Sequence, residues 1–322
     1  MKLKRIVISA LLTMGVVALA AGCSPKESKS SSTSSSAQNS KTTKITIATM
    51  AAPDSAPLYV AADKGYFKKE GLDVKLSLFK DPNKRDAATS AGQADAAVVD
   101  FTSFTSYMRS KKPDWKLITQ LTGRFGVAIP KNSNVKSVKD LKGKKVANMS
   151  RQVTSYYMYK TLKQNGVNPK DVDQVNVPQI PQRLEMIKNN QAAAAVLPQT
   201  FLTIAKVQGC KILTQSGSDF QVTALAAKGK LLSDKDVRSK FLKAYNRAVN
   251  ELNDHPDVLT QVMEKDLSLP APVAKAAPKQ FPRYNKAKTP SVKTMKQVLK
   301  FAKEEGFFTK KVNPADYIVP VD

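Results

Sequence analysis

The sequence KITIATMAAPDSAPLYVAADKGYFKKEGLDVKL occupies residues 44–76 and contains a complete strand–helix–strand unit. Its first residues, 44–48, alternate between apolar and polar side chains, which predicts a β-strand. An apolar helical segment follows at about 56–63, and residues 72–78 alternate again as a second strand. Such a unit is typical of an open α/β sheet, so we expect the rest of the chain to be built on sheets of this kind.

A polar turn joins the first of these strands to the helix. The turn contains Asp54 and Ser55, and Gly65 stands where the helix should end, since glycine readily adopts the left-handed conformation of a helix cap. In open α/β sheets, ligands bind beyond the carboxyl ends of the strands. Asp54 and Ser55 are therefore predicted to line a small-molecule site.

Two phrases of the sequence resemble a known family. Residues 56–76, APLYVAADKGYFKKEGLDVKL, resemble the opening of the solute-binding proteins that serve ABC importers of sulfonate, taurine, nitrate and thiamine pyrimidines. Residues 140–147, DLKGKKVA, resemble the start of the second lobe in that family. The resemblance extends with decreasing strength from Lys44 to about Phe308. It implies a type II periplasmic-binding-protein fold, in which two α/β lobes enclose a ligand cleft.

The beginning of the chain has the layout of a secretory signal. Basic residues precede an apolar run over 6–18 that is shorter than the roughly 20 residues of a membrane span. The following LAAGC resembles a lipobox, although Ala20 stands where the usual pattern has a larger aliphatic residue. We therefore predict a lipoprotein signal peptide at 1–22 and a diacylated Cys23. The alternative is an ordinary signal peptide followed by an unmodified cysteine.

The next segment, residues 23–43, is rich in Ser, Thr and Lys and has no long aliphatic or aromatic side chain. Such a composition cannot bury enough surface to fold, so it predicts a flexible tether that spans about 25 Å. The protein is then expected on the extracytoplasmic face of the membrane, held by its lipid. With Cys23 acylated, Cys210 is the remaining cysteine, and we expect it to be a buried structural thiol.

The formal net charge of the chain is +26, and the loss of the three basic residues in the signal peptide would leave +23. A charge of this size suggests nucleic-acid binding. However, basic residues are spread along the sequence in runs of at most two, and a secreted protein does not meet nucleic acid. We expect a basic surface that faces anionic lipid headgroups or cell-wall polymers.

Alternation of strands and helices continues along the body and predicts an α/β protein in two units. Gly123-Arg124 interrupts a long strand-like segment, and the polar stretch 214–220 suits a return crossing. These breaks place the first lobe at 44–122 plus 222–322 and the second lobe at 123–221. Helical periodicity from residue 236 onward predicts C-terminal helices that pack on the first lobe.

Four loops should meet at the cleft, and each precedes a helix whose free N–H groups favour an anionic ligand group. The candidate ligand-binding residues are Asp54, Ser55, Asp100, Phe101, Thr102, Arg124, Ser150, Arg151, Gln152, Thr154, Gln199 and Thr200.

Each candidate also has a purely structural interpretation. The aspartates and serines are good helix N-caps, the aromatic residues could belong to the core, and the two arginines could be solvated. Gln199 and Thr200 stand where many family members carry an acidic residue. A purely anionic ligand conflicts with Asp54 and Asp100, whereas a zwitterion such as taurine, or an aminopyrimidine, would use both signs of charge.

The sequence predicts a binding protein and not an enzyme. His255, the single histidine, precedes a proline on a helical connection, and no phosphate loop, nucleophile elbow or metal-ligand cluster is present. We predict a monomeric receptor, without cofactor or metal, that passes a small ligand to an ABC permease with a cytoplasmic ATPase. The alternative ligand is a thiamine-precursor pyrimidine or another planar, vitamin-like compound, and the alternative of another class is a cationic surface adhesin.

Overall fold

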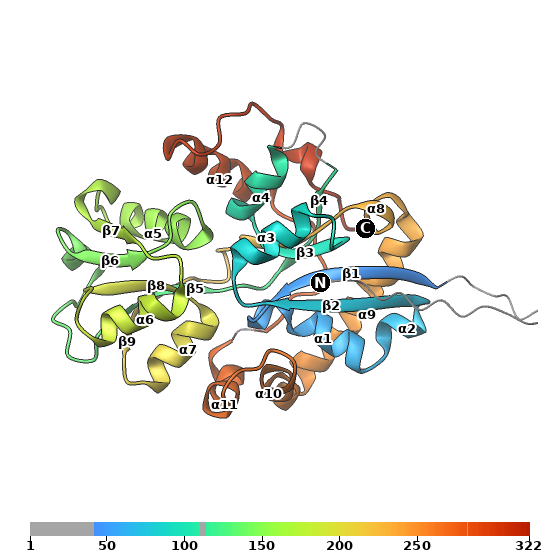
Figure 1. Ribbon diagram of the computed structural model, residues 1–322, viewed down its shortest axis with the longest axis horizontal. Coiled ribbons are helices and arrows are strands. Elements are labelled where there is room, and N and C mark those ends of the chain that lie inside the picture. Colours follow the sequence, from blue (N-terminus) through green and yellow to red (C-terminus); the bar gives the residue numbers. More distant parts are fainter. Residues whose placement is uncertain (1–41, 110–113, 282) are drawn as a thin grey trace, which may run out of the picture. The chain divides into compact units, whose positions relative to one another are not determined.

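The computed structural model describes residues 42–109, 114–281 and 283–322 (Figure 1). The predicted signal peptide at 1–22, Cys23 and the tether up to residue 41 lie outside the described residues. No helix in the described ranges combines the length and the apolarity that a membrane span requires.

Five strands form the first sheet in the order β2-β1-β3-β10-β4. They are β1 (Thr43–Met50), β2 (Leu72–Phe79), β3 (Ala96–Asp100), β4 (Lys116–Leu121) and β10 (Thr223–Ala227). β1 is parallel to β2 and β3, whereas β10 is antiparallel to its two neighbours. The parallel pairing of β1 with β2 requires a crossover connection, which helices α1 (Ala56–Asp63) and α2 (Tyr66–Lys69) supply.

The second sheet repeats this plan in the order β7-β6-β8-β5-β9. Its strands are β5 (Phe125–Ile129), β6 (Lys145–Asn148), β7 (Asp173–Asn176), β8 (Ala194–Pro198) and β9 (Lys211–Gln215). β6 is parallel to β7 and β8, and β5 is antiparallel to β8 and β9. The chain passes between the sheets at 122–124 and again at 216–222. The strand that follows each passage, β5 or β10, is the antiparallel one.

Helices cover both sheets, which explains why strands such as β3 and β8 read as continuous apolar runs (AAVVD and AAVLP). The helices that follow the strands are α3 (Pro82–Ser90), α4 (Phe101–Met108), α5 (Val153–Gln164), α6 (Ile180–Lys188) and α7 (Gln199–Val207). Single 3-10 turns lie at η1 (Pro53–Ser55), η2 (Val138–Leu141), η3 (Pro169–Asp171) and η4 (Pro314–Tyr317).

The C-terminal helices are α8 (Gly229–Ser233), α9 (Lys235–Asp254), α10 (Pro256–Lys265), α11 (Ala271–Gln280) and α12 (Val292–Glu304). α9 packs against α1 and α2, α10 packs against α1, and α12 packs against α4, so these helices cover the first sheet as predicted (Figure 1). α11 differs because it also contacts α7, a helix of the second sheet.

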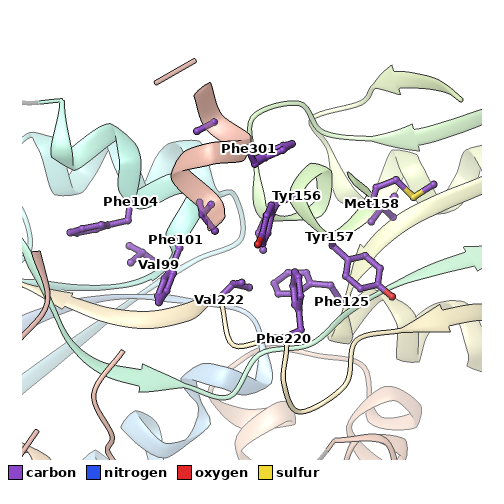
Figure 2. Close-up of a cluster of buried hydrophobic side chains, with 14 of the residues drawn as sticks. Val99, Phe101, Phe104, Phe125, Tyr156, Tyr157, Met158, Phe220, Val222 and Phe301 are labelled. Atoms are coloured by element: carbon purple, nitrogen blue, oxygen red, sulfur yellow. The ribbon is translucent and has the colours of Figure 1, made fainter. Parts of the chain in front are cut away.

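An aromatic cluster fixes the second passage between the sheets (Figure 2). The ring centroid of Phe220, in the passage itself, lies 6.0 Å from that of Phe125, 5.8 Å from Tyr156 and 5.3 Å from Tyr157. Phe301 of α12 lies 5.3 Å from Tyr156 and continues the cluster toward side chains of β3 and α4. The same buried apolar core therefore reaches both sheets at this edge, where burial of large aromatic rings stabilises the connection.

Candidate functional site

A cavity of about 590 Å³ lies where the carboxyl ends of the parallel strands of both sheets meet. Residues 50–54, 78–85 and 98–100, which end or follow β1, β2 and β3, contribute what we call the first wall. The second wall comes from Met149, Arg183 and residues 152–154, 179–181 and 198–201, which end or follow strands of the second sheet. This position agrees with the rule that ligands of open α/β sheets bind beyond the carboxyl ends of the strands.

The cavity brings together part of the predicted ligand-binding set. Asp54, Asp100, Arg124, Gln152, Thr154, Gln199 and Thr200 line it. Gly123, Arg124 and Phe125 lie at the first passage between the sheets, so they form the floor between the two walls. The amide N–H of Gln199 donates to the carbonyl of Arg124 at 3.0 Å, which ties the second wall to this floor.

The other predicted residues do not line the cavity. Ser55 is buried and its Oγ accepts from the amide of Met50 at 3.2 Å, so it holds the turn that carries Asp54. Phe101 belongs to the aromatic core of Figure 2, and Thr102 is buried beside it in α4. Ser150 and Arg151 are exposed, and Arg151 adopts a left-handed backbone with φ of 60°.

The two predicted acids have different environments. Asp100 is the N-cap of α4: its Oδ1 accepts from the amide of Ser103 at 2.8 Å, and its Oδ2 accepts from the Ser103 hydroxyl at 2.6 Å. Both oxygens are thus occupied by the protein, which supports the capping interpretation. Asp54 is buried, and its Oδ1 has no hydrogen-bond partner among the residues that the structure describes.

Burial dominates the electrostatics of Asp54 and raises the pKa of its carboxyl from 3.8 to about 7. The charge of Arg85 and the backbone N–H groups of Ser55 and Asp54 lower the pKa by smaller amounts, and the charge of Asp100 raises it. Burial raises the pKa of the Tyr245 and Tyr284 hydroxyls, and the charge of Asp54 raises it further by a smaller amount. An unpartnered carboxyl in an apolar cavity favours its neutral form until a hydrogen-bond donor reaches it.

Polar contacts between side chains or carbonyls connect the two sides of the cavity. Ser103 Oγ lies 2.8 Å from Gln152 Oε1, although its single proton is shared with the shorter bond to Asp100 Oδ2. Thr200 Oγ1 donates to the carbonyl of Ala51 at 3.3 Å, and Gln179 Nε2 donates to Asp81 Oδ2 at 3.4 Å. Two of these distances are near the upper limit for a hydrogen bond. Contacts across the mouth of the cavity are therefore weak compared with the aromatic packing at the passage.

Sequence reasoning missed two buried arginines in the walls, Arg85 and Arg183. Each is the fourth residue of the helix that follows an edge strand, α3 or α6. Each also donates from Nη1 to a strand carbonyl 13 residues later, to Val98 at 3.0 Å and to Val196 at 3.2 Å. The sequence holds a signal for them, because Arg85 and Arg183 precede the similar strands AAVV and AAVL by the same spacing.

The charge environments of these two arginines are different. Arg85 donates from Nε and Nη2 to Asp86 Oδ1 at 2.9 and 2.8 Å. Burial is the largest single effect and lowers the pKa of Arg85, but the charges of Asp86, Tyr107 and Asp100 together with the hydrogen bonds to Asp86 outweigh it, so the pKa is raised. Arg183 donates to the carbonyls of Val177, at 2.7 Å, and Pro178, at 3.1 Å. Burial alone lowers the pKa of Arg183 to about 10.

Further polar atoms in the cavity lack a partner within the described residues. They are Nε of Arg124 and the hydroxyls of Thr154 and Thr223, all buried. The Thr223 side chain packs directly against Gly123, where a Cβ atom would collide with its hydroxyl. In residues 42–109, 114–281 and 283–322 no cluster of three or more His, Cys, Asp and Glu side chains is close enough to hold a metal ion.

The fold is similar to that of solved binding proteins. The aliphatic sulphonate-binding protein SsuA of Escherichia coli matches with a TM-score of 0.74 and 17% identity, covering 86% of this chain and 97% of that protein. The nitrate-binding protein NrtA of Synechocystis PCC 6803 matches with a TM-score of 0.68 and 16% identity, covering 86% and 85%. At these identities the likeness shows the fold, which is the predicted periplasmic-binding-protein fold.

Sequence comparisons add relatives of two kinds. A Haemophilus influenzae protein whose name associates it with thiamine biosynthesis is 26% identical over 282 residues, covering 84% of this chain and 89% of the relative. The 4-amino-5-hydroxymethyl-2-methylpyrimidine phosphate synthase of Aspergillus parasiticus is 32% identical over 116 residues, or 33% of this chain and 34% of that protein. The family model described as NMT1/THI5 like matches residues 52–258. The chain therefore belongs to the NMT1/THI5-like family.

Proposed function

We propose that this chain is the extracytoplasmic solute-binding lipoprotein of an ABC transporter. It captures a small anionic or zwitterionic metabolite of the sulfonate, taurine or nitrate kind and delivers it to a permease with a cytoplasmic ATPase. The observation that carries the proposal is the cavity between the two sheets, in which Asp54 Oδ1 and Arg124 Nε are buried without partners. Unsatisfied buried polar atoms are costly, and a ligand that pairs with them recovers that cost.

The proposed mechanism is closure of two lobes, 44–122 plus 222–322 and 123–221, on the ligand. The bonds across the mouth include Thr203 Oγ1 to Gln280 Oε1 at 3.3 Å, together with the contacts of Thr200 and Gln179 described above. These few bonds would break on opening, whereas the aromatic cluster around Phe220 would act as the pivot. The permease would then recognise the closed form that the ligand favours.

We further propose that the protein acts at the membrane as a monomer through a lipid on Cys23, without binding nucleic acid. A diacyl group contributes about 0.8 kcal/mol per buried methylene, which suffices for stable anchoring. Mass spectrometry of the mature N-terminus tests this proposal. We expect a diacylated Cys23 in the unsubstituted protein. We expect Cys23→Ser to lose the lipid and to be released from the membrane. An unmodified cysteine on a protein that is not bound to the membrane would refute the proposal.

A planar, vitamin-like ligand such as a thiamine-precursor pyrimidine is the second candidate. Aromatic side chains in the lining, including Phe79, Phe201 and Phe281, favour it because they can stack on a flat ring. The names of the two relatives in sequence point in the same direction. In either case we propose binding without chemistry, since His255 is exposed and the lining holds no histidine or cysteine.

A thermal-shift and calorimetric panel of sulfonates, taurine, nitrate, pyrimidine precursors and riboflavin tests the proposal. A ligand present at 100 times its Kd stabilises the native state by about 2.7 kcal/mol, which is easily detected. We expect one chemical class to bind and to be recovered unchanged. A flat response to the whole panel, with adhesion to cell-wall polymers, would instead identify a cationic adhesin, and conversion of the ligand would identify an enzyme.

A further inference from the structure

We propose that the ligand has two separated poles and that Arg183 is the residue that binds its anionic pole. Asp54 on the first wall accepts from an ammonium or other N–H group, and Arg183 on the second wall holds a sulfonate, carboxylate or similar anion. The ligand class is therefore an organic zwitterion that spans the cavity. This inference rests on the proposed function and specifies its substrate.

Asp54, Asp81 and Asp100 are the acids that line the cavity, and they differ in whether an oxygen is free to accept from a ligand. Asp100 uses both oxygens to cap α4. Asp81 accepts from the amide of Asn83 at 2.8 Å with Oδ1 and from Gln179 with Oδ2. Asp54 has a buried oxygen without a donor, and the side chain is 92% buried because its relative exposure is 8%. A donor that enters the cavity can satisfy this oxygen.

The lysines and arginines that line the cavity differ in whether they are buried and whether an acid already neutralises them. Lys80 and Lys84 are exposed to solvent. Arg85 is neutralised by Asp86 at 2.8 Å. Arg183 is 2% exposed, and its three hydrogen bonds all go to backbone carbonyls, which carry no net charge. A guanidinium has five N–H donors, so part of it remains free to bind an anion.

Arg124 extends the positive region along the floor of the cavity. Its Nε is buried without a partner, and the residue lies at the passage between the two walls. A charge-assisted hydrogen bond from a guanidinium to an anion is about twice as strong as a neutral one. The positive region thus belongs to the second wall and the floor, whereas the free acceptor belongs to the first wall.

The size and lining of the cavity exclude a small inorganic anion as the best ligand. Its volume of about 590 Å³ is typical of pockets for organic molecules. Apolar side chains of both walls, such as Leu78, Phe79, Val153 and Ile180, line the same cavity. A nitrate ion could satisfy one pole but would leave Asp54 without a donor.

Calorimetry at pH 8 on the mature chain, made soluble by Cys23→Ser, tests the inference with four probes. The probes are 3-aminopropanesulfonate, propanesulfonate, propylamine and nitrate. We expect the aminosulfonate to bind at least about tenfold more tightly than each of the single-pole probes, since one charged hydrogen bond is worth about that factor or more. Asp54→Asn should abolish its advantage over propanesulfonate, and Arg183→Gln should abolish its advantage over propylamine.

Controls separate binding from structure. Arg183→Lys keeps the charge and should retain part of the advantage over propylamine, whereas Glu185→Gln, on the exposed face of α6, should change neither ratio. The two-pole assignment would be overturned if the protein bound aminosulfonate and propanesulfonate with equal affinity. It would also be overturned if the variants lowered the affinity for every probe by the same factor. Tighter binding of a neutral aminopyrimidine than of any aminosulfonate would overturn it as well, while leaving the receptor function intact. If calorimetry detects binding of none of these compounds, both the two-pole assignment and the proposed receptor function are overturned.

Discussion

The two walls of the cavity are built to one plan but carry different charges. In each wall an arginine in the fourth position of a helix donates to a valine carbonyl 13 residues later, Val98 in the first wall and Val196 in the second. The residue after Arg85 is Asp86, which neutralises it, whereas the residue after Arg183 is Leu184, which packs into the core. The backbone plan therefore fixes where the arginines lie, and one neighbouring side chain decides whether the charge stays available.

The comparison explains why a cavity between similar halves can bind an asymmetric ligand. The first wall combines a neutralised arginine with an unpartnered acid, Asp54, and the second combines an uncompensated arginine with amide and hydroxyl groups. A buried charge without a partner is expensive, so it is retained where a ligand supplies the partner. The following predictions alter one wall at a time.

We expect the largest effect, a loss of stability, from Asp86→Asn. This substitution makes the first wall like the second by leaving its arginine without a neighbouring acid. This change removes the negative charge that faces the Arg85 guanidinium, while the amide oxygen that replaces Oδ1 can still accept from the Tyr107 hydroxyl. Loss of one partner of a buried ion pair costs about 3–5 kcal/mol, and we expect the lower end because Asp86 is 21% exposed. Urea unfolding measures the loss.

Asp236→Asn is the matched control for Asp86→Asn, since it removes an acid from an exposed pair with Lys240. Such surface pairs contribute less than about 1 kcal/mol. If Asp86→Asn unfolds within about 1 kcal/mol of the unsubstituted chain, the neutralisation of Arg85 is not what distinguishes the first wall.

We expect a smaller effect of opposite sign, an increase in stability, for Asp54→Asn in the absence of ligand. The pKa of Asp54 is about 7 in the folded chain and 3.8 in the unfolded chain, so the folded state holds an extra proton between these values. Stability is therefore lost as the pH rises from about 4 to about 7. Asp54→Asn removes this loss and should raise stability at pH 8 by about 2 kcal/mol, with an upper limit of about 4 kcal/mol.

At pH 4 the same substitution should have almost no effect on stability, because Asp54 is then neutral in the folded chain. Thermal unfolding of both proteins at pH 4 and pH 8 checks this difference. A stabilisation of equal size at the two pH values would mean that the charge of Asp54 is not its cause.

We expect the affinity for the ligand to depend on pH because of one group in the first wall, the Asp54 carboxyl. An ammonium group prefers the Asp54 carboxylate, so the affinity for 3-aminopropanesulfonate should fall about tenfold between pH 8 and pH 5.5. The other groups whose charges affect Asp54 are Arg85 and Asp100, and the charge of Asp54 acts on Tyr245 and Tyr284. Calorimetry with Asp54→Asn should give a flat profile, and a persistent slope would assign the proton to another group.

The smallest effect is expected at the mouth, where the walls touch. Thr203→Val removes the donor to Gln280 Oε1 and the acceptor of Gln199 Nε2 while keeping the shape of the side chain. One hydrogen bond contributes about 0.5–1.5 kcal/mol, so we expect a two- to tenfold faster release of ligand. Stopped-flow dissociation measures it, with the remote Thr260→Val as control. Unchanged release would show that this contact does not hold the closed form.

The sequence predicted the elements well where local pattern decides them. The helix expected at 56–63 is α1, and the strands around 44–48 and 72–78 are β1 and β2. These segments have clear periodicity and a glycine, Gly65, with φ of 68° where the helix ends. The periodicity predicted an α/β protein in two units, and the family resemblance implied the two-lobed fold with a cleft. The order of strands within each sheet was not predicted.

The site was predicted only in part because side-chain burial depends on tertiary packing. Asp54 and Asp100 look alike in sequence, yet only the position of Ser103 makes Asp100 a cap with both oxygens occupied. Arg85 and Arg183 were overlooked because arginine is seldom buried. The repeated spacing from arginine to strand would have indicated them, since it places each side chain against a strand carbonyl at the cavity.

The most direct measurement is a crystal structure of the protein grown with 3-aminopropanesulfonate. We expect one molecule between the two sheets, with its sulfonate within hydrogen-bond distance of Arg183 and its ammonium on Asp54 Oδ1. Anomalous scattering from the sulfonate sulfur would fix its orientation. A ligand in the reverse orientation, or one bound outside the cavity, would contradict the assignment of the two poles.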